Sequence, residues 1–268
     1  TLVVAGFDLL DARQSSLGRL GNIEQKLPEV LALALNNRGH LRALSASGFH
    51  MARGGVDAPA FFDNENLDDV LPGHALGSQF VMSGVVRNLS MINPDADKER
   101  FFDEALDSFG WGREKRLRQF VLDVFIHDAF SGALMFQQAY AAQGNWNLDE
   151  DLAIGFASPQ FWKQDYGRQV KHVLQQVVHD VDNTLACQPF MGKVASTHGK
   201  QLRINAGTAS GLRPGDDLYL YRTRSLYDAN QKVGIDLQPT KVKAKIIRVL
   251  PTFALAELSQ SAMVLGIQ

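Results

Sequence analysis

The sequence predicts an α+β protein built from two domains. Residues 1–188 are predicted to form an α/β domain with a mixed sheet packed by helices, and residues 189–268 a small antiparallel β-barrel or SH3-like domain. Three observations predict this: an apolar run at Thr1–Leu10, a long helical pattern that stops before Pro189, and a period of two from Phe190 onward. The length of 268 residues suits two domains of ~100–200 residues each.

The apolar run Thr1–Leu10 predicts a buried strand near the centre of the first sheet. It contains the β-branched Val3 and Val4 and is bounded by the turn-like segment Asp11–Ser16. The run starts at the first residue without a polar lead-in. Because a buried strand is an unusual natural start for a chain, we expect a fragment cut just upstream of a domain.

The next elements of the first domain follow from their periodicity. Apolar residues recur at helical spacing from Ile23 to Leu35, and Gly39 provides a stop. Pro28 predicts either a kink or a helix that begins at Pro28. Strands are predicted at Leu41–Ala46, at Gln79–Met91 with Gly84 as a bulge or close approach, at Leu117–Asp128, and at Leu134–Ala142, which pairs with the preceding strand as a hairpin.

A long helix is predicted to close the first domain. Ser158 and Pro159 are typical of an N-cap and first helical position, and the pattern runs as one helix to Cys187. Lysines alternate with apolar residues in Lys241–Ile246, which indicates a strand with one wet and one dry face. The strands predicted for the second domain are Lys200–Ala206, Asp217–Arg222, Lys241–Val249 and Thr252–Leu258.

The charge of the chain is divided between its two halves. Residues 1–188 contain 16 Lys and Arg against 24 Asp and Glu, a net charge of -8, whereas residues 189–268 contain 11 against 5, a net charge of +6. Opposite charge in adjacent blocks supports a domain boundary near residue 188 and suits mutual docking or two different partner surfaces.

Composition also excludes several classes of function. The overall net charge of -2 predicts no general affinity for nucleic acid, and no apolar run approaches the ~20 residues of a membrane-spanning helix. The single cysteine, Cys187, excludes an internal disulfide, and its expected place is a small apolar core position at a helix end.

Two His-Asp dipeptides are the candidates for metal chemistry. His127-Asp128 and His179-Asp180 invite comparison with metal-dependent phosphohydrolases. Neighbouring side chains on a strand point to opposite faces, however, so the first pair is poorly arranged to bind one ion. The acidic segment Asp57–Asp69 lacks the alternating oxygen ligands of a calcium loop. We therefore predict no cofactor and no metal.

Two long stretches resemble a known family. They are VVAGFDLLDARQSSLGRLGNIEQKLPEVLALAL near the start and CQPFMGKVASTHGKQLRINAGTASGLRPGDDLYLYR from Cys187 onward. Together they resemble the middle and C-terminal domains of flagellar assembly protein T from polarly flagellated Gram-negative bacteria. The most specific pieces are GFDLLDARQSSLG, CQPF and INAGTASGLRPGD, none of which is a catalytic motif.

This resemblance implies a periplasmic, non-enzymatic protein of the flagellar basal body. The family builds the outer (H) ring around the LP ring and supports assembly of the T ring and the stator. The implied partners are LP-ring and T-ring proteins and further copies of the chain in a ring. The middle domain of the family is similar to the N-terminal α/β domain of the Tol-system β-propeller protein, and a further N-terminal domain is expected before residue 1.

Two other functions are also compatible with the sequence. One is a periplasmic adaptor of the Tol type that binds envelope proteins, and the other is the metal-dependent phosphohydrolase. For a binding function, aromatic residues in polar, loop-like segments are the interface candidates, with local packing as the alternative reading. These candidates are Phe61, Phe62, Phe101, Phe102 and Trp111.

Overall fold

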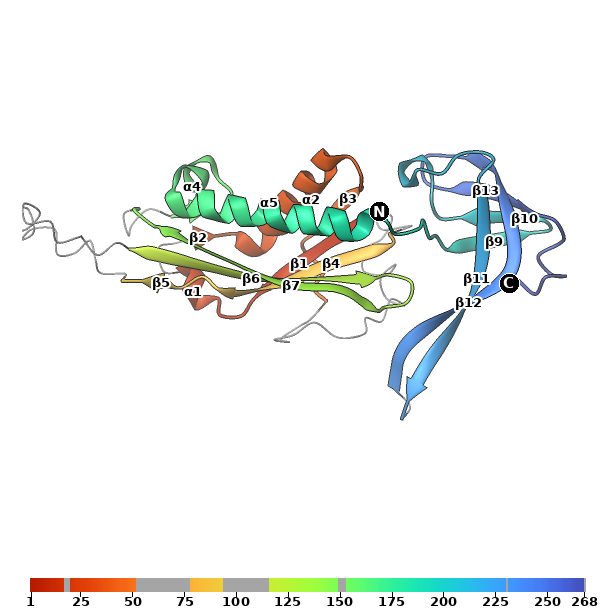
Figure 1. Cartoon of the computed structure of the whole chain (residues 1–268), viewed down its shortest axis with the longest axis horizontal. Coiled ribbons are helices and arrows are strands. Elements are labelled where there is room, and N and C mark those ends of the chain that lie inside the picture. The colour runs from red at the N-terminus through yellow and green to blue at the C-terminus, as the bar shows by residue number, and fades with distance from the viewer. Residues whose placement is uncertain (17–19, 52–77, 94–115, 149–152, 230, 268) are drawn as a thin grey trace, which may run out of the picture.

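The computed structural model contains two large sheets that lie end to end, joined by the segment that follows the long helix (Figure 1), and one two-stranded sheet. It describes residues 1–16, 20–51, 78–93, 116–148, 153–229 and 231–267. Each sheet has its own hydrophobic cluster, one drawn from residues 2–185 and the other from residues 202–262. The protein is of the mixed α+β class, as predicted; a division into domains at residue 188 stays a prediction.

The first sheet is mixed, as the sequence predicts. Its order is β3-β1-β4-β6-β5, and β7 pairs with the other side of β6. Strand β1 is parallel to both of its neighbours, whereas β6 is antiparallel to β4, β5 and β7. The bounds are β1 Leu2–Leu9, β3 Ala43–Ala46, β4 Phe80–Asn88, β5 Met91–Ile92, β6 Leu117–Asp128 and β7 Leu134–Asn145, and a separate short pair is formed by β2 Leu20–Gly21 and β8 Ile154–Gly155.

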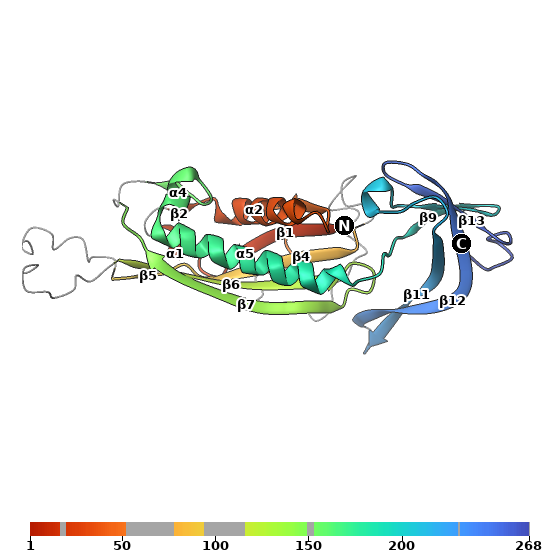
Figure 2. The same ribbon diagram turned by 45° about the horizontal axis from the view of Figure 1, so that its top comes forward.

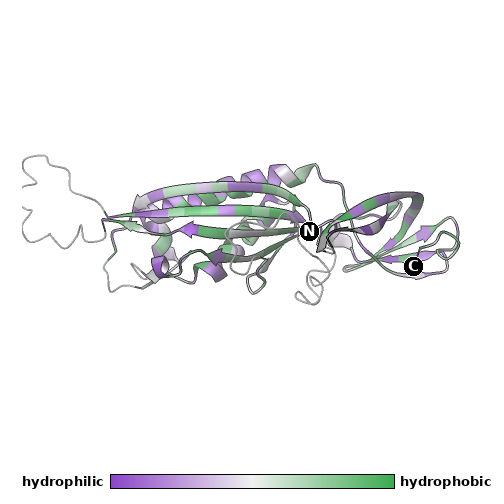
Figure 3. Ribbon diagram, turned by 90° about the horizontal axis from the view of Figure 1, so that it is seen from below, coloured by the Kyte–Doolittle hydropathy of each residue, from purple (hydrophilic) through white to green (hydrophobic). Residues whose placement is uncertain are grey.

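Helices α2 (Ile23–Arg38) and α5 (Asp165–Ala186) cover one face of this sheet (Figures 1 and 2). Their buried apolar residues join the core under β1, β4 and β6. Helix α2 runs through Pro28, so a start at Pro28 is wrong, while Gly39 ends the helix in the left-handed conformation that glycine tolerates. Seen from below, the strands lie in front of the helices and carry both hydrophobic and hydrophilic residues (Figure 3).

The single long helix predicted from Ser158 to Cys187 is interrupted. Ser158 caps α4 (Pro159–Lys163) by accepting a hydrogen bond from the Phe161 amide, which confirms the predicted entry. Gln164 is extended, and α5 begins at Asp165. Gly167 allows the close turn, because a Cβ at this position would clash with the carbonyl of Phe161. The apolar periodicity of the sequence continues from α4 into α5, so the spacing of apolar residues alone predicts one helix.

The predicted close approach at Gly84 is confirmed. Gly84 lies opposite Phe7 in the β1–β4 ladder, where the register shifts, and opposite Val124 in the β4–β6 ladder. A Cβ on Gly84 would clash with the buried Phe7 ring and with the backbone oxygen of Asp123. The absent side chain lets the Phe7 ring lie directly against the middle of the sheet.

The second sheet has five antiparallel strands in the order β11-β12-β13-β10-β9 and forms a half-barrel. Its ends, β11 and β9, do not pair with each other in the part of the chain that the structure describes. Strand β9 and the outer parts of β11 and β12 were not predicted. The bounds are β9 Val194–His198, β10 Gln201–Ile204, η3 Thr208–Ser210, β11 Asp217–Asp228, β12 Gln231–Val249 and β13 Ala254–Leu258. In β12 the wet and dry alternation is confirmed: Lys243 and Lys245 are exposed, Ala244 and Ile246 buried.

Cys187 and the helices bear on two features predicted from composition. Cys187 lies at the end of α5 as expected, but it is exposed, so its predicted place in the core is wrong. The amphipathic helix directs its buried stripe away from this last position. None of the helices in the described ranges is long and apolar enough to cross a membrane.

We expect Gly84→Ala to destabilise the first sheet by about 1–3 kcal/mol, because the methyl group would force Phe7 and the neighbouring strand apart. Urea unfolding, followed by the midpoint and slope, measures the loss. Gly155→Ala is the matched control, since a Cβ there meets nothing within 4 Å. Equal stability of the two variants would contradict the close approach.

Candidate interaction surfaces

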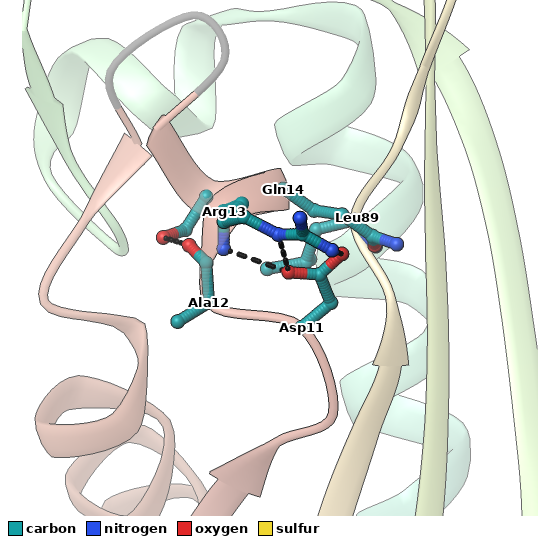
Figure 4. Close-up of polar contacts among 6 residues, drawn as sticks. Asp11, Ala12, Arg13, Gln14 and Leu89 are labelled. Carbon is teal, nitrogen blue, oxygen red and sulfur yellow. Dashed lines mark hydrogen bonds and ion pairs between the residues drawn. The ribbon is translucent and has the colours of Figure 1, made fainter.

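The turn after β1 carries GFDLLDARQSSLG, one of the three most specific pieces of the sequence, and its hydrogen bonds connect two parts of the fold. Arg13 donates to Asp11 through its backbone amide and its Nε, both at 3.0 Å, and the Leu89 amide donates to the Gln14 side chain at 2.7 Å (Figure 4). The hydrogen bonds from Arg13 lower the pKa of Asp11. The one-turn helix α1 (Arg13–Ser16) is thereby fixed to the segment after β4, so this motif serves the scaffold.

A buried arginine, which sequence reasoning missed, braces the same region. Arg118 on β6 is fully buried and donates from Nη2 to the backbone oxygen of Gln14 at 2.9 Å. Its guanidinium lies 4.7 Å from the ring centroid of Trp146 and 5.9 Å from that of Tyr166. Burial lowers its pKa, yet arginine stays charged. Only its alternation with apolar neighbours in β6 could have indicated an inward-facing position.

A groove runs along the junction of β7 and α5. It is open to solvent, has a volume of about 520 Å³, and is lined by Gln138–Ala141 on the strand and by polar residues of the helix, among them His172, Gln176 and Asp180. The Tyr140 hydroxyl donates to Asp180 at 2.8 Å across its floor. Burial, followed by this hydrogen bond, raises the pKa of Tyr140, so the phenol is neutral at physiological pH. The strand and the helix are therefore held at a fixed spacing.

Strand β7 is the long edge of the first sheet. Among the residues that the structure describes it pairs with β6 alone, and its twelve residues include no proline and no charged side chain. Gln137, Gln138 and Ala139 in its middle are exposed. Natural edge strands are commonly protected by lysine, proline or a bulge, because their free N–H and C=O groups accept another strand. β7 carries neither lysine nor proline, and its register against β6 shifts between Leu134 and Phe136, near the start of the strand.

The second open surface is the outer part of the β11–β12 ribbon, which we call the arm (residues 221–228 and 231–239). In the described ranges these two segments pair with each other and with no third strand, whereas β13 pairs with β12 from Ala244 onward. The arm projects from the second sheet in both views (Figures 1 and 2). It leaves large apolar side chains exposed, namely Tyr221, Leu226, Tyr227 and Val233.

The aromatic interface candidates of the sequence, Phe61, Phe62, Phe101, Phe102 and Trp111, all lie outside the described residues. They stay predictions.

The candidate metal ligands do not come together in the structure. Asp128 accepts hydrogen bonds from the Phe130 and Ser131 amides and shapes the turn between β6 and β7. His127 is buried on β6. His179 contacts Asn183 on α5 at 3.0 Å, and Asp180 accepts from Tyr140. Within the described ranges, no three His, Cys, Asp or Glu residues are arranged to hold a metal ion.

The fold is a braced α+β scaffold with two open β surfaces in the described residues, and such surfaces are where another strand can add. Comparison with known families identifies the family to which the chain belongs. The family model for flagellar assembly protein T, middle domain, matches residues 1–156, and the model for its C-terminal domain matches residues 199–268. The chain therefore belongs to the flagellar assembly protein T family, and the predicted resemblance is confirmed. Its role is structural, in assembly of the flagellar basal body and hence in motility.

Other comparisons add no functional argument. Similar solved structures include a hypothetical protein from Chlamydia trachomatis, with a TM-score of 0.46 and 12% identity over 70% of this chain and 99% of that one. A protein from Xanthomonas campestris gives 0.35 and 9% over 69% and 83%, and the PelC dodecamer from Paraburkholderia phytofirmans gives 0.35 and 10% over 70% and 89%. No curated protein matches.

Because the four candidate ligands have separate structural contacts, we expect the purified protein to contain far less than one equivalent of transition metal. Elemental analysis after gel filtration, without chelator, measures this content. His179→Ala should leave the metal content unchanged. If the protein contained one equivalent of metal and His179→Ala removed it, the phosphohydrolase hypothesis would be supported again.

Proposed function

We propose that the chain is a non-enzymatic structural component of the periplasmic flagellar basal body that forms the outer (H) ring around the LP ring. In this role it supports assembly of the T ring and the stator. Membership in the flagellar assembly protein T family is the observation that carries the proposal. The finer assignments, to the periplasm, to the H ring and to LP-ring and T-ring partners, follow from what the resemblance implies.

The physical features of the chain support a role in a ring. A ring protein needs two different surfaces that meet on neighbouring copies, since contacts of this head-to-tail kind close into rings when the rotation permits. The chain offers two separate open β surfaces, the β7 edge and the arm, on different sheets. Its halves also carry net charges of -8 and +6, which favours contact between unlike halves.

Each contact in such an assembly can be weak. Copies held around a ring bind at high effective concentration, so many modest interfaces add up to a stable structure. The proposal therefore does not require a large hydrophobic face. A Tol-type adaptor would instead bind envelope proteins outside the flagellum, and co-purification with basal-body ring proteins, compared with Tol components, separates these two functions.

We expect deletion of the gene in a polarly flagellated bacterium that carries it to abolish or strongly reduce swimming and to remove the outer ring from isolated basal bodies. The reason is that the ring would lack its subunit. Swimming assays and electron micrographs of basal bodies, with and without a plasmid-borne copy, measure both effects. Normal outer rings in the deletion strain would refute the proposal.

A further inference from the structure

The side chain of Gln79 connects the first sheet to the segment that leads to the second sheet. Gln79 lies directly before β4 and is 6% exposed. Its Nε2 donates to the backbone oxygen of Pro189 at 2.6 Å, and its Oε1 accepts from the amide of Met191 at 3.2 Å. Because the first partner can only accept and the second can only donate, they fix which way the Gln79 amide points. The side chain thus pairs with the segment on both sides of Phe190, as a backbone peptide group of a neighbouring strand would.

The backbone of Gln79 is bound within the first sheet. Its amide donates to the oxygen of Thr1 at 2.9 Å, and its oxygen accepts from the amide of Ala129 at 2.8 Å. Thr1 precedes β1 and Ala129 follows β6. Strands β1 and β4 are parallel and begin at the same end of the sheet, and the segment after α5 passes this end (Figure 1). The hydrogen bonds to the segment therefore come from the sheet itself and not from a loop.

The same short segment is also bound by the second sheet. The ring of Phe190 packs against the hydrophobic cluster of that sheet. The amide of Lys193 donates to Asn205 Oδ1 at 2.8 Å, and the amide of Asn205 donates to the oxygen of Lys193 at 3.0 Å. Contacts from the two sheets therefore alternate along residues 189–193.

This alternation opposes the motion that a connection of this kind usually allows. Two units joined by a single chain segment move relative to each other by default, unless a large hydrophobic interface holds them. In the described ranges the hydrophobic clusters of the two sheets share no residue. The two hydrogen bonds of the Gln79 side chain act at the point about which such a motion would turn.

We propose that the Gln79 side chain is a clamp that holds the two sheets in one relative orientation, and that its release frees a hinge at residues 188–192. Its two bonds flank Phe190, so the segment cannot turn about its own axis without breaking one of them. The β7 edge and the arm lie on different sheets, so the clamp also fixes their relative positions. The inference does not rest on the proposed function, because it concerns a single copy in solution.

Distances between spin labels on the two sheets test the clamp. The parent protein carries Cys187→Ser, which removes the exposed thiol, and labels at Lys171→Cys on α5 and Ser259→Cys after β13, both exposed positions. Double electron–electron resonance gives the distribution of the distance between the labels. Gln79→Met keeps the side chain long and removes both hydrogen bonds, so we expect the narrow distribution of the parent to become at least about twofold broader. Gln188→Met, at an exposed position in the same segment, is the matched control and should stay narrow.

A broad distribution in the parent, or a narrow one in the Gln79→Met protein, would overturn the inference. Gln79→Glu provides a second variant of the same length. Its carboxylate still accepts from the amide of Met191 but cannot donate to the oxygen of Pro189, so we expect broadening here as well. A residue that only stabilised the first sheet would lower the melting temperature and leave the distribution narrow, and that result would also contradict the clamp.

Cleavage by chymotrypsin after Phe190 measures the same opening without labels. The protease needs the Phe190 ring out of its cluster and the flanking backbone free of Gln79. We expect this cleavage to become about tenfold faster in the Gln79→Met protein, since cleavage of a locally opened segment follows the population of the open form. Cleavage after the exposed Tyr227 in the arm is the internal control and should keep its rate. An unchanged rate after Phe190, or an equal rise at both sites, would refute the hinge.

Discussion

The organisation of the first sheet depends on one shared strand. β6 pairs with β4 and β5 on one side and with β7 on the other, and its C-terminal half is buried on both faces. A strand buried in this way cannot change register by one residue, because that shift would exchange every side chain between the faces. The register of β6 therefore fixes the Phe7–Gly84 contact at the centre of the sheet and places β7 at its edge.

The buried charge on β6 restricts this arrangement further. The Arg118 guanidinium has its place between two aromatic rings and the Gln14 carbonyl. A buried cation adds little net stability compared with an apolar residue of the same size, but a register that displaced it from these contacts would be costly. Arg118 thus favours one alignment of β6, the turn after β1 and α5.

The sequence was informative wherever packing follows a period. The buried strand at the start, the α2 pattern and its stop at Gly39, the close approach at Gly84 and the β6–β7 hairpin all follow from local spacing and glycine chemistry. The break between α4 and α5 at Gln164 was not predicted, because the helical spacing of apolar residues continues through it. The outer part of the β11–β12 ribbon was not predicted as strand, because its apolar residues are separated by charged ones and belong to neither hydrophobic cluster. The groove could not be predicted, since it joins residues 138–141 to residues 172–180 through tertiary packing.

The two parts of β12 differ in whether their apolar side packs on a hydrophobic cluster. Near Ala244 the strand alternates lysine with buried residues, and the dry side packs on the core of the half-barrel. Near Ile235 the same strand keeps its alternation, but in the described structure the core has ended. Because the alternation continues past the core, it predicts a strand along the whole of β12 but not which part of the strand is packed; in the described structure only the part near Ala244 joins the hydrophobic cluster of the half-barrel.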